Sequence, residues 1–83
     1  MNWFVYAIQS IQCNYIYVGL TSDLEKRISQ HNNGKERTTR PYRPFILIHH
    51  EIFGTRLEAR RREIYLKSGC GKDYLKNLSS LAK

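Results

Sequence analysis

The chain has 83 residues, 41% of them hydrophobic, and its 14 Lys and Arg against 7 Asp and Glu give a formal net charge of +7. This length supports a single core, so we expect residues 1–83 to form one domain. No apolar run approaches the ~18 residues that a membrane-spanning helix needs, and we expect no membrane partner. The positive charge favours a nucleic acid as partner, although charge alone does not distinguish DNA from RNA.

Two further features concern the location in the cell. Cys13 and Cys70 lie far apart and lack the spacing of a metal site, which predicts free thiols in a reducing compartment. The first residues show none of the pattern of a secretory signal peptide. We therefore expect a cytoplasmic protein.

Two strands are predicted first. Residues 3–9 are apolar nearly throughout, which predicts a strand buried on both faces. A second strand begins at Asn14, and its aromatic and β-branched residues 15–18 favour extended structure. The polar residues 10–13 between them form the predicted hairpin loop.

The register of this hairpin decides where two tyrosines lie. With a four-residue loop, Gln9 pairs with Asn14, and counting back along the strands places Tyr6 opposite Tyr17. Both phenols then project from one face of the sheet, within cross-strand reach. A slip of one residue would move them to opposite faces.

A helix follows the second strand. Gly19 is expected to end the strand, and Ser22 with Glu25 three residues later forms a capping box. On this helix Arg27 and His31 stand four residues apart and therefore share a face. A strand thus delivers a tyrosine, and a helix presents a cation and an imidazole, which suits a site for an anionic substrate.

A basic loop comes next, after Gly34 as the expected end of the helix. Residues 35–44 contain two prolines, Tyr42 and four cations, and these cations are Lys35, Arg37, Arg40 and Arg43. The loop either grips phosphates, with Tyr42 stacking on a base, or is a solvated linker whose charges keep the protein soluble. The sequence leaves both interpretations open.

The rest of the chain predicts a third strand and two helices. Residues 45–53 form the strand, in which the adjacent His49 and His50 point to opposite faces and cannot bind one metal ion. Thr55 and Glu58 cap a helix over residues 57–67, and a last helix covers residues 72–81. The order β-β-α-β-α-α predicts an α+β domain, a small three-stranded and largely antiparallel sheet flanked by three helices.

Glu63 is the carboxylate that caps and loops do not explain. Its spacing from Ala59 and Leu66 places it on a line with small and apolar neighbours. Leu57 and Ile64 form a second apolar line on the far side, so the spacing leaves open which face is more buried. A carboxylate buried alone costs several kcal/mol and needs a cation or a metal ion. Glu63 is therefore either in a salt bridge with the arginines at 60–62 or a ligand of a hard divalent ion such as Mg²⁺.

Taken together, these residues resemble the GIY-YIG nuclease family, in particular small single-domain members related to the N-terminal catalytic domain of the excision-repair nuclease subunit. Residues 5–7, Val-Tyr-Ala, stand where the family has Gly-Ile-Tyr, and residues 17–19, Tyr-Val-Gly, match Tyr-Ile-Gly. Arg27 and His31 match the helix pair, and Glu63 falls on the family's metal-binding glutamate. The resemblance covers nearly the whole chain.

The resemblance implies a metal-dependent endonuclease that hydrolyses DNA phosphodiester bonds, with a role in repair or recombination. Glu63 would hold Mg²⁺ or Mn²⁺, and Arg27 would neutralise charge on the phosphate. Gly19 would let the substrate approach the backbone. Tyr6, Tyr17 and His31 are the candidate general bases, and the sequence does not choose among them.

Two other interpretations remain open. A catalytically silent nucleic-acid-binding module or adaptor would keep the fold without turnover, and an RNA-associated basic protein would rest on charge alone. We expect a monomer or weak dimer, and a protein partner could supply targeting. Asn77 is the nearest candidate for an asparagine that many family nucleases carry after the glutamate helix.

Overall fold

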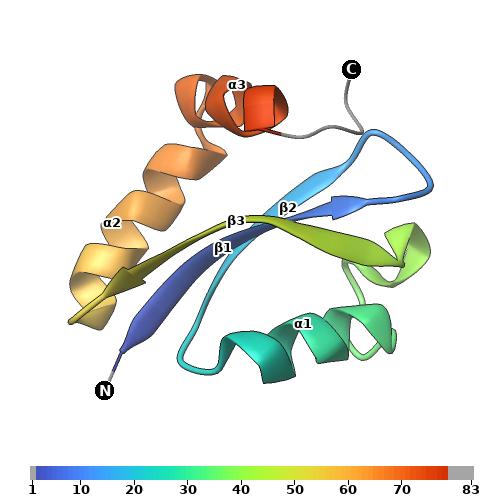
Figure 1. Ribbon diagram of the computed structural model, residues 1–83, viewed down its shortest axis with the longest axis horizontal. Helices are drawn as coiled ribbons and strands as arrows, with labels where there is room; N and C mark the ends of the chain where they lie inside the picture. The colour runs from blue at the N-terminus through green and yellow to red at the C-terminus, as the bar shows by residue number, and fades with distance from the viewer. Residues whose placement is uncertain (1, 79–83) are drawn as a thin grey trace.

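The computed structural model describes residues 2–78, which form a three-stranded sheet with helices on both of its faces (Figure 1). The strands lie in the order β2-β1-β3, and both pairs are antiparallel. The predicted α+β class and the order β-β-α-β-α-α are confirmed. In chain order the elements are β1 (Trp3–Ser10), β2 (Ile16–Thr21), α1 (Leu24–Asn32), the 3₁₀ helix η1 (Arg40–Tyr42), β3 (Phe45–Phe53), α2 (Arg56–Lys67) and α3 (Gly69–Leu78).

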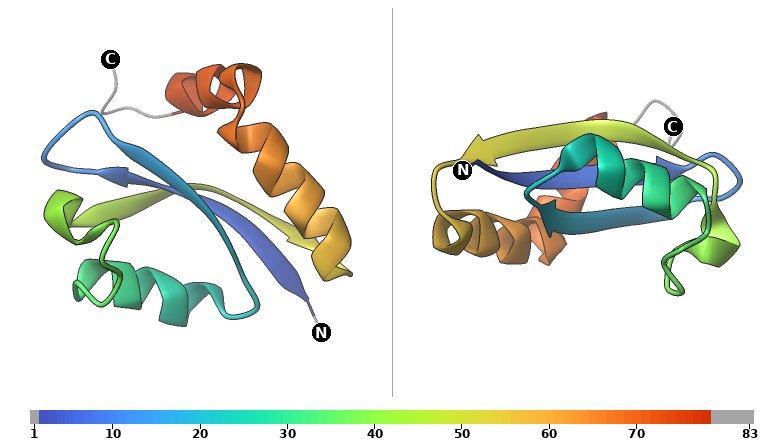
Figure 2. Two further views of the ribbon diagram at one scale, coloured as in Figure 1. Left: turned by 180° about the vertical axis from the view of Figure 1, so that it is seen from behind. Right: turned by 90° about the horizontal axis from the view of Figure 1, so that it is seen from below.

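The central strand β1 is buried on both faces, as its apolar sequence predicts. α1 covers one face of the sheet, and α2 with α3 covers the other (Figures 1 and 2). Because strand side chains alternate, β1 supplies both layers of core. The layer on the α2–α3 side contains Val5, Ala7, Val18, Ala59, Leu66 and Leu75. The layer on the α1 side contains Tyr6, Ile8 and Phe45, with Tyr15, Tyr17, Leu24 and Ile28 packed against it.

The predicted hairpin register is wrong by two residues. Tyr6 pairs with Gly19, and Tyr17 pairs with Ile8. β1 continues through Ser10 and β2 begins at Ile16, so residues 11–15 connect the strands in place of the predicted 10–13. Since side chains repeat every two residues, this shift leaves both tyrosines on the same face, and their ring centroids lie 6.3 Å apart.

The start of α1 also differs from the prediction. β2 continues through Gly19 to Thr21, so Gly19 does not end the strand. The N-cap is Asp23 and not Ser22, and its carboxylate accepts from the Lys26 N–H at 3.1 Å. An ionised cap also interacts favourably with the helix dipole. At the other end Gly34 follows the helix with a φ of +75°, which confirms it as the residue that ends the helix.

The last two helices meet more closely than predicted. The cap formed by Thr55 and Glu58 is confirmed, because the Glu58 N–H donates to the Thr55 hydroxyl at 3.2 Å. α3 begins at Gly69, three residues earlier than expected, and the predicted residues 79–81 lie outside the described residues. A Cβ at Gly71 would collide with backbone atoms of Tyr65 and Leu66. Gly71 therefore lets α3 pack against the end of α2 and does not interrupt the helix.

Candidate active site

A chain of three buried polar side chains lies between the sheet and α1. The Tyr6 hydroxyl is 2.8 Å from His31 Nε2, and His31 Nδ1 is 2.8 Å from Thr39 Oγ1. None of these three residues has exposed surface. β1 supplies the tyrosine, α1 the histidine and the following loop the threonine. The chain of hydrogen bonds therefore fixes the ring of His31 from both sides.

Gly19 makes room for the first member of this chain. It lies opposite Tyr6 in the sheet, and a Cβ at this position would collide with the hydroxyl and ring of Tyr6. Glycine is needed here because the Tyr6 ring passes close to the backbone. Approach of a substrate to Gly19, the reason expected from the sequence, stays a prediction. Gly19→Ala would push this ring away from His31.

Burial keeps both Tyr6 and His31 neutral near pH 7. Burial raises the pKa of the Tyr6 phenol to about 12, and the nearby Arg27 guanidinium offsets only part of this rise. Burial, followed by the positive charge of Arg27, lowers the pKa of His31 to about 4. A neutral imidazole has one N–H, so one of its nitrogens donates and the other accepts.

Tyr17 and Arg27 form the part of this group that solvent reaches. The Tyr17 ring is partly exposed, and its centroid is 4.9 Å from the His31 ring. The Arg27 side chain is 29% exposed, and its guanidinium donates to Gln30 Oε1 at 3.1 Å and to Glu36 Oε2 at 2.8 Å. These two contacts hold the guanidinium in place while leaving part of it open. An incoming anion would meet Tyr17 and Arg27 before the buried chain.

Glu63 lies elsewhere, on the buried face of α2, and is 6% exposed. It forms ion pairs with Arg60 at 2.7 Å and with Lys67 at 3.1 Å. Burial would raise the pKa of Glu63, but the hydrogen bonds from Arg60 and Lys67 outweigh it and hold the pKa below its usual value. Glu63 is therefore ionised at neutral pH.

The structure brings together four of the five predicted catalytic residues. Tyr6, Tyr17 and His31 are in ring contact, and Arg27 lies beside Tyr6. Within residues 2–78, no hydrogen bond or ion pair joins Glu63 to any of these four. α2 packs against β1 and β2 from the face opposite α1. The edge strand β2 therefore separates Glu63 from Tyr17.

The donor set at Glu63 is compatible with a magnesium ion. No group of three or more His, Cys, Asp or Glu gathers within the described part of the chain. Mg²⁺, however, often binds through one or two carboxylates and completes its shell with water and substrate phosphate. The two cations on Glu63 are half exposed, at 51% for Arg60 and 48% for Lys67. Both cations can turn into solvent, so a divalent ion could take their place and compensate the charge of the buried carboxylate.

The basic loop is more ordered than a solvated linker. Arg40 Nε donates to the Gly34 carbonyl at 2.7 Å, and the Arg43 guanidinium lies over Gly34. The Tyr42 ring stacks on Tyr15 with centroids 4.1 Å apart, so this face of the ring is occupied, and stacking of a base on Tyr42 stays a prediction. The four predicted cations of the loop are exposed and stay candidates for contact with nucleic acid: Lys35, Arg37, Arg40 and Arg43.

Two residues of the site were missed from the sequence, Thr39 and Glu36. Thr39 stands in a basic loop, where nothing local marks it as a buried partner of a histidine. Glu36 does carry a signal, because it is the only acidic residue between Glu25 and Glu51. Its ion pair with Arg27 shows that this loop folds back over α1.

Comparison with known proteins identifies the chain. Residues 2–76 match the GIY-YIG catalytic domain family. The chain belongs to the GIY-YIG family. This confirms the resemblance drawn from the motifs, and it places Tyr6, Tyr17, Arg27 and His31 within a catalytic-domain fold.

Similar members of the GIY-YIG family are small UPF0213 proteins. The chain is 39% identical over 64 residues to UPF0213 protein SH2523 of Staphylococcus haemolyticus. The aligned residues cover 76% of this chain and 78% of that protein. It is 42% identical over 67 residues to UPF0213 protein YazA of Bacillus subtilis, over 80% of this chain and 67% of YazA. The names of these relatives state no activity.

A solved structure agrees with the fold. The solution NMR structure of the UPF0213 protein BH0048 from Bacillus halodurans matches with a TM-score of 0.56 and 34% sequence identity. The match covers 95% of this chain and 86% of that chain. No helix within residues 2–78 is long and apolar enough to cross a membrane.

Proposed function

We propose that this protein is an endonuclease that hydrolyses phosphodiester bonds in DNA with the help of Mg²⁺ or Mn²⁺. The observation that carries the proposal is the buried chain Tyr6–His31–Thr39 beneath the accessible Tyr17 and Arg27. A module that only bound nucleic acid would need surface cations, but not a desolvated imidazole held on both ring nitrogens. Membership of a catalytic-domain family supports the same interpretation.

Arg27 would bind the phosphate that is cleaved. Its planar donors suit two phosphate oxygens, and charge-assisted hydrogen bonds are stronger than neutral ones. Glu36 and Gln30 hold the guanidinium before the substrate arrives. Arg27 would therefore stabilise the charge that develops on the phosphate in the transition state at little cost in reorganisation.

Of the three candidate bases, Tyr17 is the one that can touch the attacking water. Tyr6 and His31 have no exposed surface, and a phenol with a pKa of about 12 is a poor base near pH 7. Tyr17 would orient the water, and Tyr6 would act as a positioning residue beneath it. In this assignment the Tyr6 O–H donates to His31 Nε2, and His31 Nδ1–H donates to Thr39 Oγ1.

Glu63 would hold the divalent ion after Arg60 or Lys67 moves aside. When bound, this ion would polarise the scissile phosphate and stabilise the leaving oxygen. The lowered pKa of Glu63 keeps its carboxylate ready to bind the ion. A role in repair or recombination, on branched, flapped or damaged DNA, belongs to the same proposal.

Covalently closed circular DNA tests the proposed endonuclease activity. We expect Mg²⁺-dependent conversion of supercoiled circles to nicked and linear forms, which stops when EDTA removes the ion. An enzyme that needs DNA ends would leave closed circles intact. Firm binding without cleavage of circular, flapped or four-way-junction DNA would instead support the adaptor interpretation.

Thr39→Val tests the positioning chain. Valine has a similar shape but cannot accept from His31 Nδ1, and one unpaired buried donor lowers the free energy of unfolding by about 1–3 kcal/mol. Without the Thr39 hydroxyl the His31 imidazole can rotate, and we expect kcat to fall by about tenfold, the rate equivalent of ~1.4 kcal/mol. KM should stay unchanged. Steady-state kinetics and the ¹⁵N chemical shifts of His31 measure both effects. Thr39→Ser retains the hydroxyl and should restore them; a valine variant with wild-type kcat and ¹⁵N shifts contradicts the assignment.

A further inference from the structure

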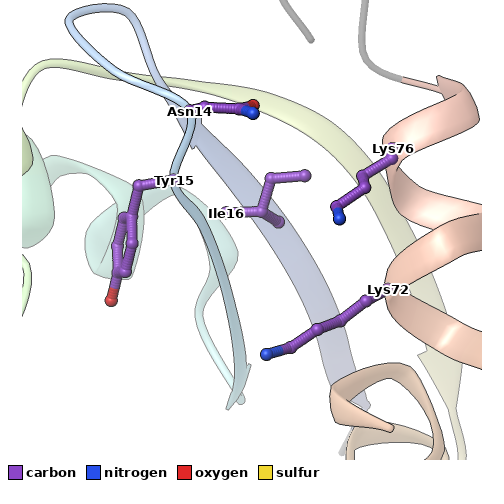
Figure 3. A pocket seen from close by; sticks show the side chains of 5 residues that line it. All are labelled: Asn14, Tyr15, Ile16, Lys72 and Lys76. Atoms are coloured by element: carbon purple, nitrogen blue, oxygen red, sulfur yellow. The ribbon is translucent and has the colours of Figure 1, made fainter. Parts of the chain in front are cut away.

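A cavity of about 270 Å³ lies on the side of β2 away from α1, between the β1–β2 hairpin and α3 (Figure 3). Its lining consists of Asn14, Tyr15, Ile16, Lys72 and Lys76. Figure 3 shows Lys72 and Lys76 reaching from α3 towards β2, on either side of Ile16, with the Asn14 side chain beyond Ile16 on the side of Lys76. The Tyr15 ring points away from α3. Two ammonium groups and a carboxamide thus line one cavity.

The charge of this cavity is unbalanced. Lys72 and Lys76 are four residues apart on α3, so they lie on the same face of the helix. Within residues 2–78 neither lysine forms an ion pair, and no carboxylate lines the cavity. Two like charges at neighbouring helix positions repel each other, and an anion between them would remove this repulsion.

The cavity lies next to the candidate active site, across one strand. β2 is an edge strand, and successive residues on it point to opposite faces. Tyr17 faces the His31 ring on the α1 side, whereas its neighbour Ile16 faces α3. A phosphodiester chain that crosses the edge of β2 could therefore contact Tyr17 and Arg27 on one side and the lysines on the other.

We propose that Lys72, Lys76 and Asn14 form a second phosphate-binding site, which holds a backbone phosphate of the nucleic acid beside the one that is cleaved. This inference rests on the proposed function, because it assumes that a nucleic acid crosses β2. Each lysine offers three donors, and the Asn14 amide offers two more. The cavity has room for one phosphate with part of its sugar, and the apolar Ile16 would contact the sugar.

Salt-dependent DNA binding tests this site. The double variant Lys72→Gln/Lys76→Gln is compared with Lys26→Gln/Arg61→Gln, which removes the same charge from exposed positions outside both sites. Fluorescence anisotropy with a labelled duplex, in EDTA and over a range of KCl concentrations, gives Kd for each protein. Circular dichroism confirms that the variants are folded. Because EDTA removes divalent ions, the result does not depend on cleavage.

We expect Lys72→Gln/Lys76→Gln, the cavity variant, to bind the DNA duplex about tenfold more weakly than the wild type. The slope of log K against log salt concentration should become shallower by about one unit, as for the loss of one phosphate contact. The control should change both quantities much less. Equal changes in both variants would show that the lysines act only through net charge, and would overturn the proposal. So would absence of DNA binding by the wild-type protein.

A second measurement separates a backbone phosphate from a free one. Inorganic phosphate is titrated into the ¹⁵N-labelled protein, and the amide signals of Asn14, Lys72 and Lys76 are followed. Shifts with short DNA at concentrations where inorganic phosphate has no effect support the proposal. Shifts with inorganic phosphate, combined with unchanged DNA affinity of the cavity variant, would make the cavity a free-phosphate site and overturn it.

Discussion

Arg27→Ala should lower kcat for DNA cleavage by about 10²- to 10³-fold, the effect typical of removing one preorganised donor to transition-state charge. The guanidinium is already held by Glu36 and Gln30, so its alignment would be complete before the substrate binds. The loss should appear mainly in kcat, because the charge on the phosphate increases as the transition state forms. Single-turnover cleavage of end-labelled DNA in excess protein measures this step directly.

Two matched variants make this result specific. Arg27→Lys keeps the charge but loses the planar donor fork, and it should recover only part of the rate. Arg61→Ala removes an equal charge from an exposed position on α2 and should leave kcat within about twofold, since single surface charges have small effects. Wild-type kcat in Arg27→Ala would remove this residue from the proposed chemistry.

The second large effect concerns stability at mildly acidic pH. His31 has a pKa of about 4 when folded and about 6.5 when unfolded, so the unfolded state binds more protons between these values. The contribution of His31 to the free energy of unfolding is therefore fully present above pH ~6.5 and is lost as the pH falls towards 4. The loss should approach a value on the order of 3 kcal/mol, at ~1.4 kcal/mol per pH unit. Urea unfolding at several pH values measures it.

His31→Gln isolates this contribution. Glutamine can still hydrogen-bond to Tyr6 and Thr39 but does not titrate, so its stability should be nearly flat between pH 7 and 5. Glu51 and Glu63 have lowered pKa values and affect stability only at lower pH. An NMR titration of the His31 ring provides a second readout that needs no unfolding. A pKa near 6.5 in the folded protein would contradict the account.

The sequence placed Tyr6 and Tyr17 on one face although it gave the wrong register. The apolar pattern determines which face a side chain occupies, because that property repeats every two residues. The position of the loop determines the pairing itself, and composition does not reveal that β1 continues through Ser10, whose N–H donates to the Tyr15 carbonyl. An error of two residues was therefore harmless to the site, whereas an error of one would have separated the tyrosines.

Helical spacing reduced the choice of buried face on α2 to two. Ala59, Glu63 and Leu66 form one line, which the structure buries. Leu57 and Ile64 form the other line, which is exposed. Spacing did not show which cations would meet the carboxylate, because Lys67 and Arg60 approach it from different turns.

Residues that depend on the path of a loop could not be predicted. Thr39 reaches His31 only because the segment after Gly34 folds back over α1, and no local periodicity specifies that path. The cap of α1 shows a related limit. Ser22 and Asp23 are both good N-caps, and the extension of β2 to Thr21 decides between them.

Cleavage of a 5′-labelled DNA flap in Mg²⁺ by the wild-type protein and by Glu63→Gln tests whether this protein is a metal-dependent nuclease. Glutamine preserves the size of the side chain but removes the charge that would hold the ion. We expect metal-dependent cleavage by the wild type and a loss of cleavage of at least about 10²-fold in the variant, with DNA binding in EDTA unchanged. Equal cleavage by both proteins would assign the activity to a contaminant and contradict the proposed nuclease.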